Sequence, residues 1–589
     1  MFFKKSNLCL IVSFALILGV FSDYLFHQKS VGVSFFVFIS LVIILILILV
    51  VKSKKRISKT QSLILILAIL LSAFIFLRSS SFLSFFNFYG SIYLLFLFLV
   101  LFFNRNILNF SFTKYISLPT SFFVRSFREA GSFVKKCKLM IPESNKVGSK
   151  EFRSVIKGTI IAIPFLIIFA LLLSSADQVF QSYLNKFFKF DLDFEIVLRV
   201  LKVSIISYLF LGIFYRITKG SDQSSESTLD QSSELVLDKK AEEVKGLDHR
   251  TEVTSEENES SSFIESATVL VLIEALFLLF IVIQFFYLFG GKDYVWGLNE
   301  YITYSEYAKK GFHELIYVSI LSFILIYAID VFGKRKTLKE KKIFKILGTV
   351  LILEISVIIY SAWTRMAVYV DGYGLTFSRF FVFVFLLWIF LVFLNFLYKI
   401  LSEKRKEFFF LSIFCFSAIF WIGINVINPD AFIARKNVQR LIQLGSIDHY
   451  YLSRLSVDSI PETMKIFQTN VDEKIKMEVA EGLYFRCAFL FGGRYYFMGP
   501  SWEEEPISFG EKLENIRERQ NENWQSLNIS ERKALLALEE NYQEIVKYQS
   551  KYFKKQADEC WEMMKDCNGK WGCEKEMCEM YEKKAKLEE

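Results

Sequence analysis

Eleven long apolar runs divide most of this 589-residue chain, and they constrain its fold more than any other feature. A run of roughly 18 or more apolar residues crosses a hydrocarbon core of about 30 Å as a helix, because a helix satisfies its own backbone hydrogen bonds. The runs lie at residues 8–26, 31–51, 61–77, 83–103, 154–175, 196–215, 263–288, 314–331, 343–362, 380–397 and 408–427. The sequence therefore predicts an all-α fold, a polytopic membrane helix bundle of about eleven spans.

The composition excludes a water-soluble globular protein, because 53% of the residues are hydrophobic and 17% are aromatic. The first apolar run follows Lys4 and Lys5, as in a signal sequence, but no small-residue cleavage site follows it. We therefore interpret this run as a retained signal anchor.

The basic residues predict which side of the membrane each loop occupies. With eleven spans, the loops on the side of the N-terminus carry 35 Lys and Arg residues and the opposite loops carry nine. Because positive loops stay in the cytoplasm, we expect a cytoplasmic N-terminus and an exterior C-terminus. The net charge of +9 is then explained by loops facing anionic lipid, and no nucleic acid is expected as a partner.

The chain divides into six expected segments. They are four membrane helices (1–103), a basic cytoplasmic or interfacial segment (104–153), membrane helices five and six (154–216), an acidic Ser-rich disordered cytoplasmic linker (217–262), membrane helices seven to eleven (263–428) and a mostly helical exterior domain (429–589). Residues 113–138 fit either a helix in the headgroup region or a basic flexible loop. In the exterior domain, Ser459 to Glu462 and Asn528 to Glu531 have the pattern of capped helix starts.

No nucleotide-binding motif, nucleophile elbow or metal-binding pair of histidines is present in the sequence, so no metal and no cofactor are expected. Glu274 and Glu354 fall near mid-membrane, where an ionised carboxylate costs on the order of 3 kcal/mol or more unless it is paired. They predict either a proton or cation relay or a neutral interhelical contact. If its helix continues, Glu354 begins a polar stripe through Ser361, Arg365 and Tyr369.

Polar and aromatic clusters follow four of the spans, all on the expected exterior side. Either they form interfacial aromatic belts and helix caps, or they share one pocket centred on Arg365, with a carboxylate of Asp177, Asp371 or Asp430 in ion-pair reach. The residues of this expected exterior site are Asp177, Tyr304, Tyr307, Glu314, Arg365, Tyr369, Asp371, Asp430 and Arg435.

The same loops carry five strings that resemble a known family. The strings SSADQVF, YLFGG, YSEYAKKGFHEL, TRMAVYVDGYGLT and INPDAFIARKN, in this order, resemble the bacterial integral membrane family described as domain of unknown function 4173. The resemblance covers roughly residues 157–461. It implies a bacterial inner-membrane protein and supplies no activity, because that family has none assigned.

The C-terminal tail contains four of the eight cysteines, in an amphipathic segment broken near Asn568 and Gly569. Two short antiparallel helices would bring Cys560 level with Cys578, and Cys567 level with Cys573. An exterior location favours disulfides over a zinc site, because the compartment is oxidising and the spacing lacks close cysteine pairs. If the compartment is reducing, unpaired cysteines are expected instead.

Three functions remain open at this stage. The first is an interaction, sensing or assembly role in the envelope, with a protein or wall partner for the exterior domain. The second is a transporter or channel that uses the membrane carboxylates. The third, a lipid-linked substrate enzyme, is supported least, because the spacing identifies no reaction.

Overall fold

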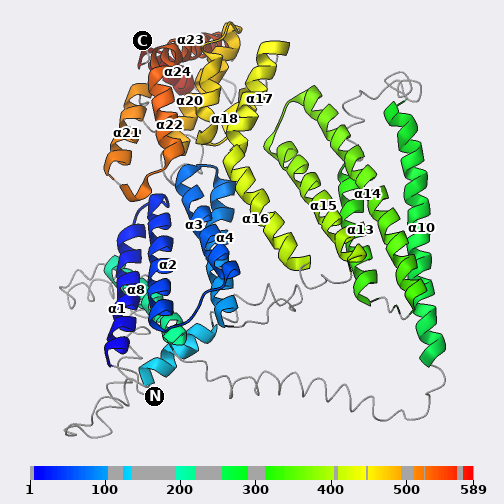
Figure 1. Cartoon of the computed structure of the whole chain (residues 1–589). Helices are drawn as coiled ribbons and strands as arrows, with labels where there is room; N and C mark the ends of the chain where they lie inside the picture. The colour runs from blue at the N-terminus through cyan, green and yellow to red at the C-terminus, as the bar shows by residue number, and fades with distance from the viewer. Residues whose placement is uncertain are drawn as a thin grey trace, which may run out of the picture.

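A computed structural model describes most of the chain and consists of helices throughout the described residues (Figure 1). The described residues are 5–103, 124–135, 194–218, 255–289, 312–332, 335, 337–402, 409–445, 449–491, 508–522, 524–566 and 575–587. The C-terminal helices gather at one end of the bundle, which we call the upper end as drawn in Figure 1.

The first group of membrane helices surrounds a core of Leu, Ile and Phe side chains. It contains α1 (Lys5–Phe26), α2 (Val33–Lys52), α3 (Lys59–Leu77), α4 (Ser81–Phe103) and α8 (Phe194–Thr218). A capping box starts α3, because Ser58 and Gln61 each bond the backbone N–H of the other. The helix formed by residues 124–135, within the segment expected to be interfacial, packs on α8 through the buried ring of Phe133.

The second group has a separate apolar core and stands beside the first (Figure 1). It contains α10 (Ser255–Phe289), α13 (Phe312–Phe332), α14 (Leu338–Tyr373) and α15 (Phe377–Leu401). Helix α16 (Phe409–Ile427) links the two groups, since Phe409 belongs to the core of the second group while Trp421 packs against that of the first. Asn87 of α4 and Asn425 of α16, both fully buried, hydrogen-bond across this contact at 2.8 Å.

The structure confirms the all-α polytopic bundle. Ten of the eleven expected spans coincide with described helices, and the run at 154–175 lies outside the described residues. Within the described ranges, eight helices are long and apolar enough to cross a membrane, and α13 contains a shorter apolar stretch, Leu315–Val331. A ninth span is obtained if α16 and the next helix are counted as one bent pair.

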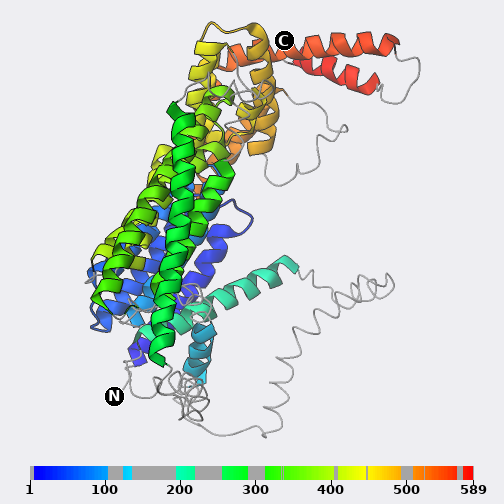
Figure 2. The same ribbon diagram turned by 90° about the vertical axis from the view of Figure 1, so that its right-hand side faces the viewer.

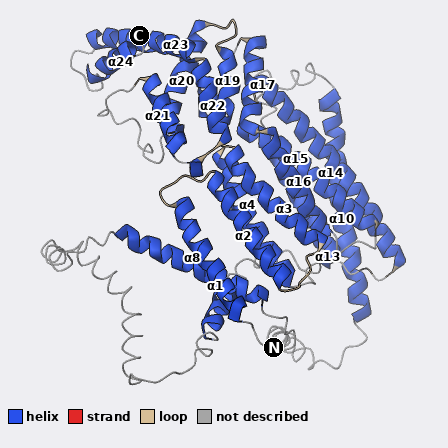
Figure 3. Ribbon diagram, turned by 60° about the vertical axis from the view of Figure 1, so that its left-hand side comes forward, coloured by secondary structure: helices blue, strands red, loops and turns tan. Residues whose placement is uncertain are grey.

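The C-terminal domain covers the upper end of the first group (Figures 2 and 3). Its longer helices are α17 (Pro429–Leu444), α18 (His449–Arg454), α20 (Glu473–Phe491), α21 (Phe509–Glu522), α22 (Ile529–Glu540), α23 (Tyr542–Asp566) and α24 (Lys575–Leu587). Short helical turns occupy Val457–Ser459, Ile460–Thr463, Met464–Ile466 and Trp524–Ser526. One apolar core joins these helices and includes Leu375 from the turn between α14 and α15 and Phe380 from the first turn of α15.

Of the two expected helix caps in this domain, one is confirmed and one is wrong. The Asn528 side chain accepts hydrogen bonds from the backbone N–H groups of Ser530 and Glu531 and so starts α22. Ser459 makes no cap, because its backbone is already helical and its hydroxyl donates to the carbonyl of Ser456 instead. The helix that follows has only four residues.

Side-chain hydrogen bonds attach the C-terminal domain to the turn between α3 and α4. The Asp458 carboxylate accepts from the backbone N–H groups of Ser79 and Ser80, at 3.0 and 3.1 Å. The Asn528 amide donates to the carbonyls of Ile75 and Arg78, so the residue that starts α22 also satisfies the end of α3. The domain and the membrane helices therefore form one connected structure.

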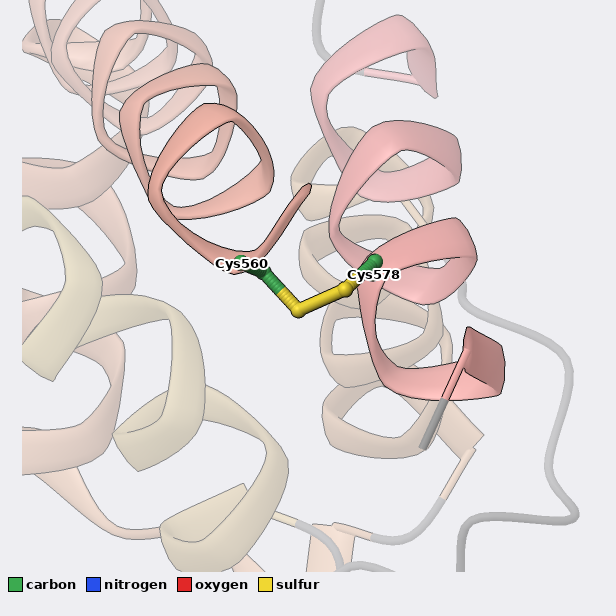
Figure 4. The surroundings of a disulfide bond; sticks show 2 residues. All are labelled: Cys560 and Cys578. Atoms are coloured by element: carbon green, nitrogen blue, oxygen red, sulfur yellow. A yellow bond between two sulfur atoms is a disulfide. The ribbon is translucent and has the colours of Figure 1, made fainter. Parts of the chain in front are cut away.

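A disulfide joins Cys560 of α23 to Cys578 of α24, with 5.5 Å between the Cα atoms (Figure 4). This confirms the outer of the two expected pairs and the antiparallel helical tail. Cys567 and Cys573 lie outside the described residues.

Candidate functional site

A groove of about 1010 Å³ lies where α14, α15 and α16 meet α17 at the upper end of the second group. The membrane helices supply apolar walls and α17 supplies a polar edge. Its lining residues are Trp363, Ala367, Val370, Asp371, Gly374, Leu375, Phe380, Phe383, Val384, Leu387, Ile419, Phe420, Gly423, Ile424, Ile427, Phe432, Lys436, Asn437, Gln439, Arg440, Gln443 and Leu444.

The groove exists because the chain bends sharply between α16 and α17. The two helices are inclined by 51°, and Asn428 between them has the left-handed conformation, with φ 56°. Asparagine tolerates this conformation, and Pro429 cannot continue the preceding helix because it has no N–H and its ring clashes with the preceding turn. The Asn-Pro sequence thus turns the chain across the ends of α14 and α15.

The side chain of Asn437 fixes α17 to the turn between α14 and α15. Its amide oxygen accepts from the N–H of Leu375 at 2.9 Å, and its amide nitrogen donates to the carbonyl of Leu375 at 2.7 Å. Gly374 has φ 80°, and a Cβ on it would lie 3.0 Å from the Asn437 oxygen, so both the conformation and the space favour glycine. The Arg440 guanidinium adds a 2.6 Å hydrogen bond to the carbonyl of Gly372.

The groove is amphipathic. Ile419, Ile427 and Leu444 are 64%, 51% and 63% exposed, so its apolar surface is open rather than filled by the protein itself. Lys436 and Arg440 are one helical turn apart on α17 and place two cations at the polar edge, with Asp371 as the acidic lining residue. The Nε atom of Arg440 is buried and has no hydrogen-bond partner among the described residues.

Of the expected exterior-site residues, Asp371 lines this groove, while Asp430 and Arg435 of α17 contact other parts of the C-terminal domain. Buried Asp430 accepts a hydrogen bond from the hydroxyl of Ser456. Arg435 forms a 2.7 Å ion pair with Glu462, whose pKa is lowered because hydrogen bonds and positive charge outweigh its desolvation. These two residues therefore hold α17 against the rest of the C-terminal domain.

Of the other residues of the expected exterior site, the structure describes some and not others. The expected polar stripe required one continuous helix, and α14 is continuous. It carries the four residues of the stripe, Glu354, Ser361, Arg365 and Tyr369. Arg365 is half-buried and has a non-covalent partner within the chain. Glu314 belongs to α13, but its side chain is outside the described residues, as are Asp177, Tyr304 and Tyr307. Convergence of the full set stays a prediction.

Sequence reasoning missed Arg379, which interacts with the aromatic residues near the upper end of α14. Its guanidinium lies 4.2 Å from the ring centre of Tyr369 and donates to the carbonyls of Tyr373 and Gly374. It also missed the groove residues Lys436, Gln439, Arg440 and Gln443. Their spacing of three, one and three residues marks one polar face of a helix, and that pattern could have identified them.

Glu274 of α10 and Glu354 of α14 lie inside the second group of membrane helices, with 9% and 8% of their surface exposed. The two helices pack together, and the carboxylates are close enough to interact electrostatically. Among the residues that the structure describes, no group of three or more His, Cys, Asp and Glu side chains could hold a metal ion.

These features define the chain as a polytopic α-helical membrane protein. It belongs to the family described as domain of unknown function DUF4153, whose sequence model matches residues 65–466. The expected resemblance to family 4173 is therefore wrong in its particular family, although the family that matches is also uncharacterised. No curated protein and no solved structure matches the chain.

The matched residues extend from within α3 to the short helical turn at Met464–Ile466. They include the Asn428 bend, the groove and the two membrane glutamates. Helices α20 to α24 lie beyond them. The candidate site thus falls inside the family region, while most of the C-terminal domain falls outside it.

Proposed function

We propose that this chain is an interaction or sensing component of the bacterial envelope, in which the groove binds an anionic membrane lipid. Its apolar walls suit acyl chains, and the two cations at its edge suit a phosphate headgroup. The observation that most supports this proposal is the Nε atom of Arg440, which is buried and unpartnered beside open apolar surface. A buried guanidinium N–H without an acceptor favours binding of an anion.

Helix α17 supports a sensing role because it takes part in both the groove and the C-terminal domain. Lys436 and Arg440 line the groove, while Ile433, Val438 and Leu441 are buried in the core of the domain. Occupation of the groove would therefore act on a helix that is packed in the core of the C-terminal domain. Such coupling requires the lipid to bind one arrangement of α17 better than another.

The proposed orientation puts the N-terminus in the cytoplasm and the C-terminal domain outside, in the inner membrane. It rests on the basic residues of the lower-end loops, such as Lys52 to Lys59. The groove would then lie at the outer boundary of the membrane. A protein or wall partner of the C-terminal domain remains part of this proposal.

Transport of a small solute or ion is the second candidate function. The observation that favours it is the pair of membrane carboxylates, Glu274 and Glu354, on adjacent helices.

The test compares lipid binding to the full chain and its variants by native mass spectrometry, with phosphatidylglycerol and phosphatidylcholine as probes. The chain should retain phosphatidylglycerol preferentially, and Arg440→Gln combined with Lys436→Gln should weaken that retention by about tenfold. Arg440→Lys should restore part of it. The exposed Lys474→Gln in α20 is the control for loss of charge. Equal retention of both lipids by the native chain would overturn the proposal.

A further inference from the structure

Glu274 and Glu354 belong to α10 and α14, two helices that pack against each other. A small cavity between these helices is lined by Leu270 of α10 and Leu347 of α14. Glu274 follows Leu270 by one helical turn, and Glu354 follows Leu347 by two turns. The two glutamates therefore lie within about one helical turn of each other along the contact.

The surroundings of this pair are apolar. Leu351 and Ile355 of α14 and Leu270 of α10 are almost completely buried there. The atoms Glu274 Oε1 and Glu354 Oε2 are buried and have no hydrogen-bond partner in the part of the chain that the structure describes. Each side chain is more than nine-tenths buried, so each carboxyl group needs a proton, a cation or a hydrogen-bond donor.

Two ionised carboxylates cannot both be stable in this position, because like charges repel strongly where the surroundings are apolar. One proton resolves both problems. It neutralises one carboxyl group, and the resulting O–H can donate to an oxygen of the other carboxylate. We propose that Glu274 and Glu354 form a proton-binding site inside the membrane that holds one exchangeable proton between them.

A bound metal cation fits this site less well. Calcium takes about six to eight oxygen ligands, whereas the pair supplies two carboxyl groups in an apolar environment. No cluster of three or more acidic, His or Cys ligands occurs among the described residues. Proton sharing needs only the two groups that are present.

The shared proton would also help to hold α10 in place. Leu272, Leu276 and Leu279 on α10 are 66%, 60% and 57% exposed, so much of this helix faces away from its neighbours. Removal of the proton would put two negative charges across the contact of α10 with α14. The site thus couples protonation to the packing of one membrane helix, and this inference does not depend on whether the groove binds lipid.

Infrared difference spectroscopy of the full chain in lipid nanodiscs tests the proposal. A protonated carboxyl group has a carbonyl stretch that an ionised one lacks, and the band shifts in heavy water when its proton exchanges. We compare the native chain with Glu274→Gln, Glu354→Gln and the double variant. Glutamine matches the size and neutrality of a protonated glutamate, and Glu544→Gln at an exposed position of α23 is the control.

At neutral pH, each single variant should lose the same band as the double variant, because the pair holds one proton. The control should keep that band. If each single variant lost only half of the band intensity that the double variant loses, the two glutamates would hold two independent protons. That result would overturn the proposal. No loss in any variant would also overturn it, because both glutamates would then be ionised. In the native chain alone, a band that fails to shift in heavy water would contradict an exchangeable proton.

Discussion

Asn437 of α17 makes two hydrogen bonds to the backbone of Leu375, one to its N–H and one to its carbonyl. The contact joins the C-terminal domain to the turn that forms one side of the groove. Asn437→Ala removes both bonds and leaves two buried backbone groups unsatisfied, so we expect a loss of about 2–3 kcal/mol in the free energy of unfolding. Thermal unfolding of the purified chain measures this loss. Gln439→Ala, two residues further along α17 and exposed, should have little effect.

The disulfide between Cys560 and Cys578 should stabilise the helical tail. The cysteines are 18 residues apart. A disulfide that closes a loop of this length lowers the entropy of the unfolded chain and so adds about 3 kcal/mol to the free energy of unfolding. Cys560→Ser combined with Cys578→Ser should make α23 and α24 easier to cleave in limited proteolysis. Cys9→Ser removes a free cysteine and is the control. Non-reducing peptide mapping that finds Cys560 and Cys578 as free thiols would contradict the pair.

Attachment of the domain should weaken as pH rises. Burial, helped by the charge of Asp458, raises the pKa of Glu531 from 4.5 to about 7 in the folded chain. The folded state therefore binds more protons than the unfolded state, and its stability is fully present below pH 4.5 and falls as pH rises through about 7. Protonation of Glu531 contributes at most about 3 kcal/mol to the free energy of unfolding. Arg78 is the nearby cation that also interacts with Asp458.

Glu531→Gln should remove this pH dependence of thermal unfolding between pH 5 and pH 8. The residue is at the start of α22, where the domain contacts α3. Glu540→Gln, exposed at the end of the same helix, should leave the dependence unchanged. A native chain equally stable across this range would contradict the argument.

Reporter fusions test the proposed orientation. Fusions after Lys59, Gly220, Lys342 and Lys406 should behave as cytoplasmic, and fusions after Ser80, Gly291, Gly372 and Pro461 as exterior. A cytoplasmic signal from the Pro461 fusion would overturn the count of eleven spans.

The membrane helices could be predicted from the sequence because lipid leaves an apolar run few alternatives to a helix. The cap at Asn528 followed from local chemistry. The cap at Ser459 was wrong because tertiary packing continues the chain helically through that residue. Local patterns cannot report such packing.

The groove could not be predicted, because it depends on how four helices meet. Its walls are ordinary apolar side chains, which look like any lipid-facing surface in the sequence. Charged residues near one another in the sequence also separate in space. Arg435 pairs with Glu462 in the domain, whereas Lys436 lines the groove on another side of the same helix.

The most direct test of the central claim is photocrosslinking with a phosphatidylglycerol analogue that carries a reactive group in its acyl chain. Peptide mapping should place the adducts on groove residues such as Phe383, Ile419 and Leu444. Unlabelled phosphatidylglycerol should compete for them better than phosphatidylcholine, and Arg440→Gln should reduce them. Adducts spread evenly over the lipid-facing helices, with equal competition by both lipids, would contradict a specific lipid site in the groove.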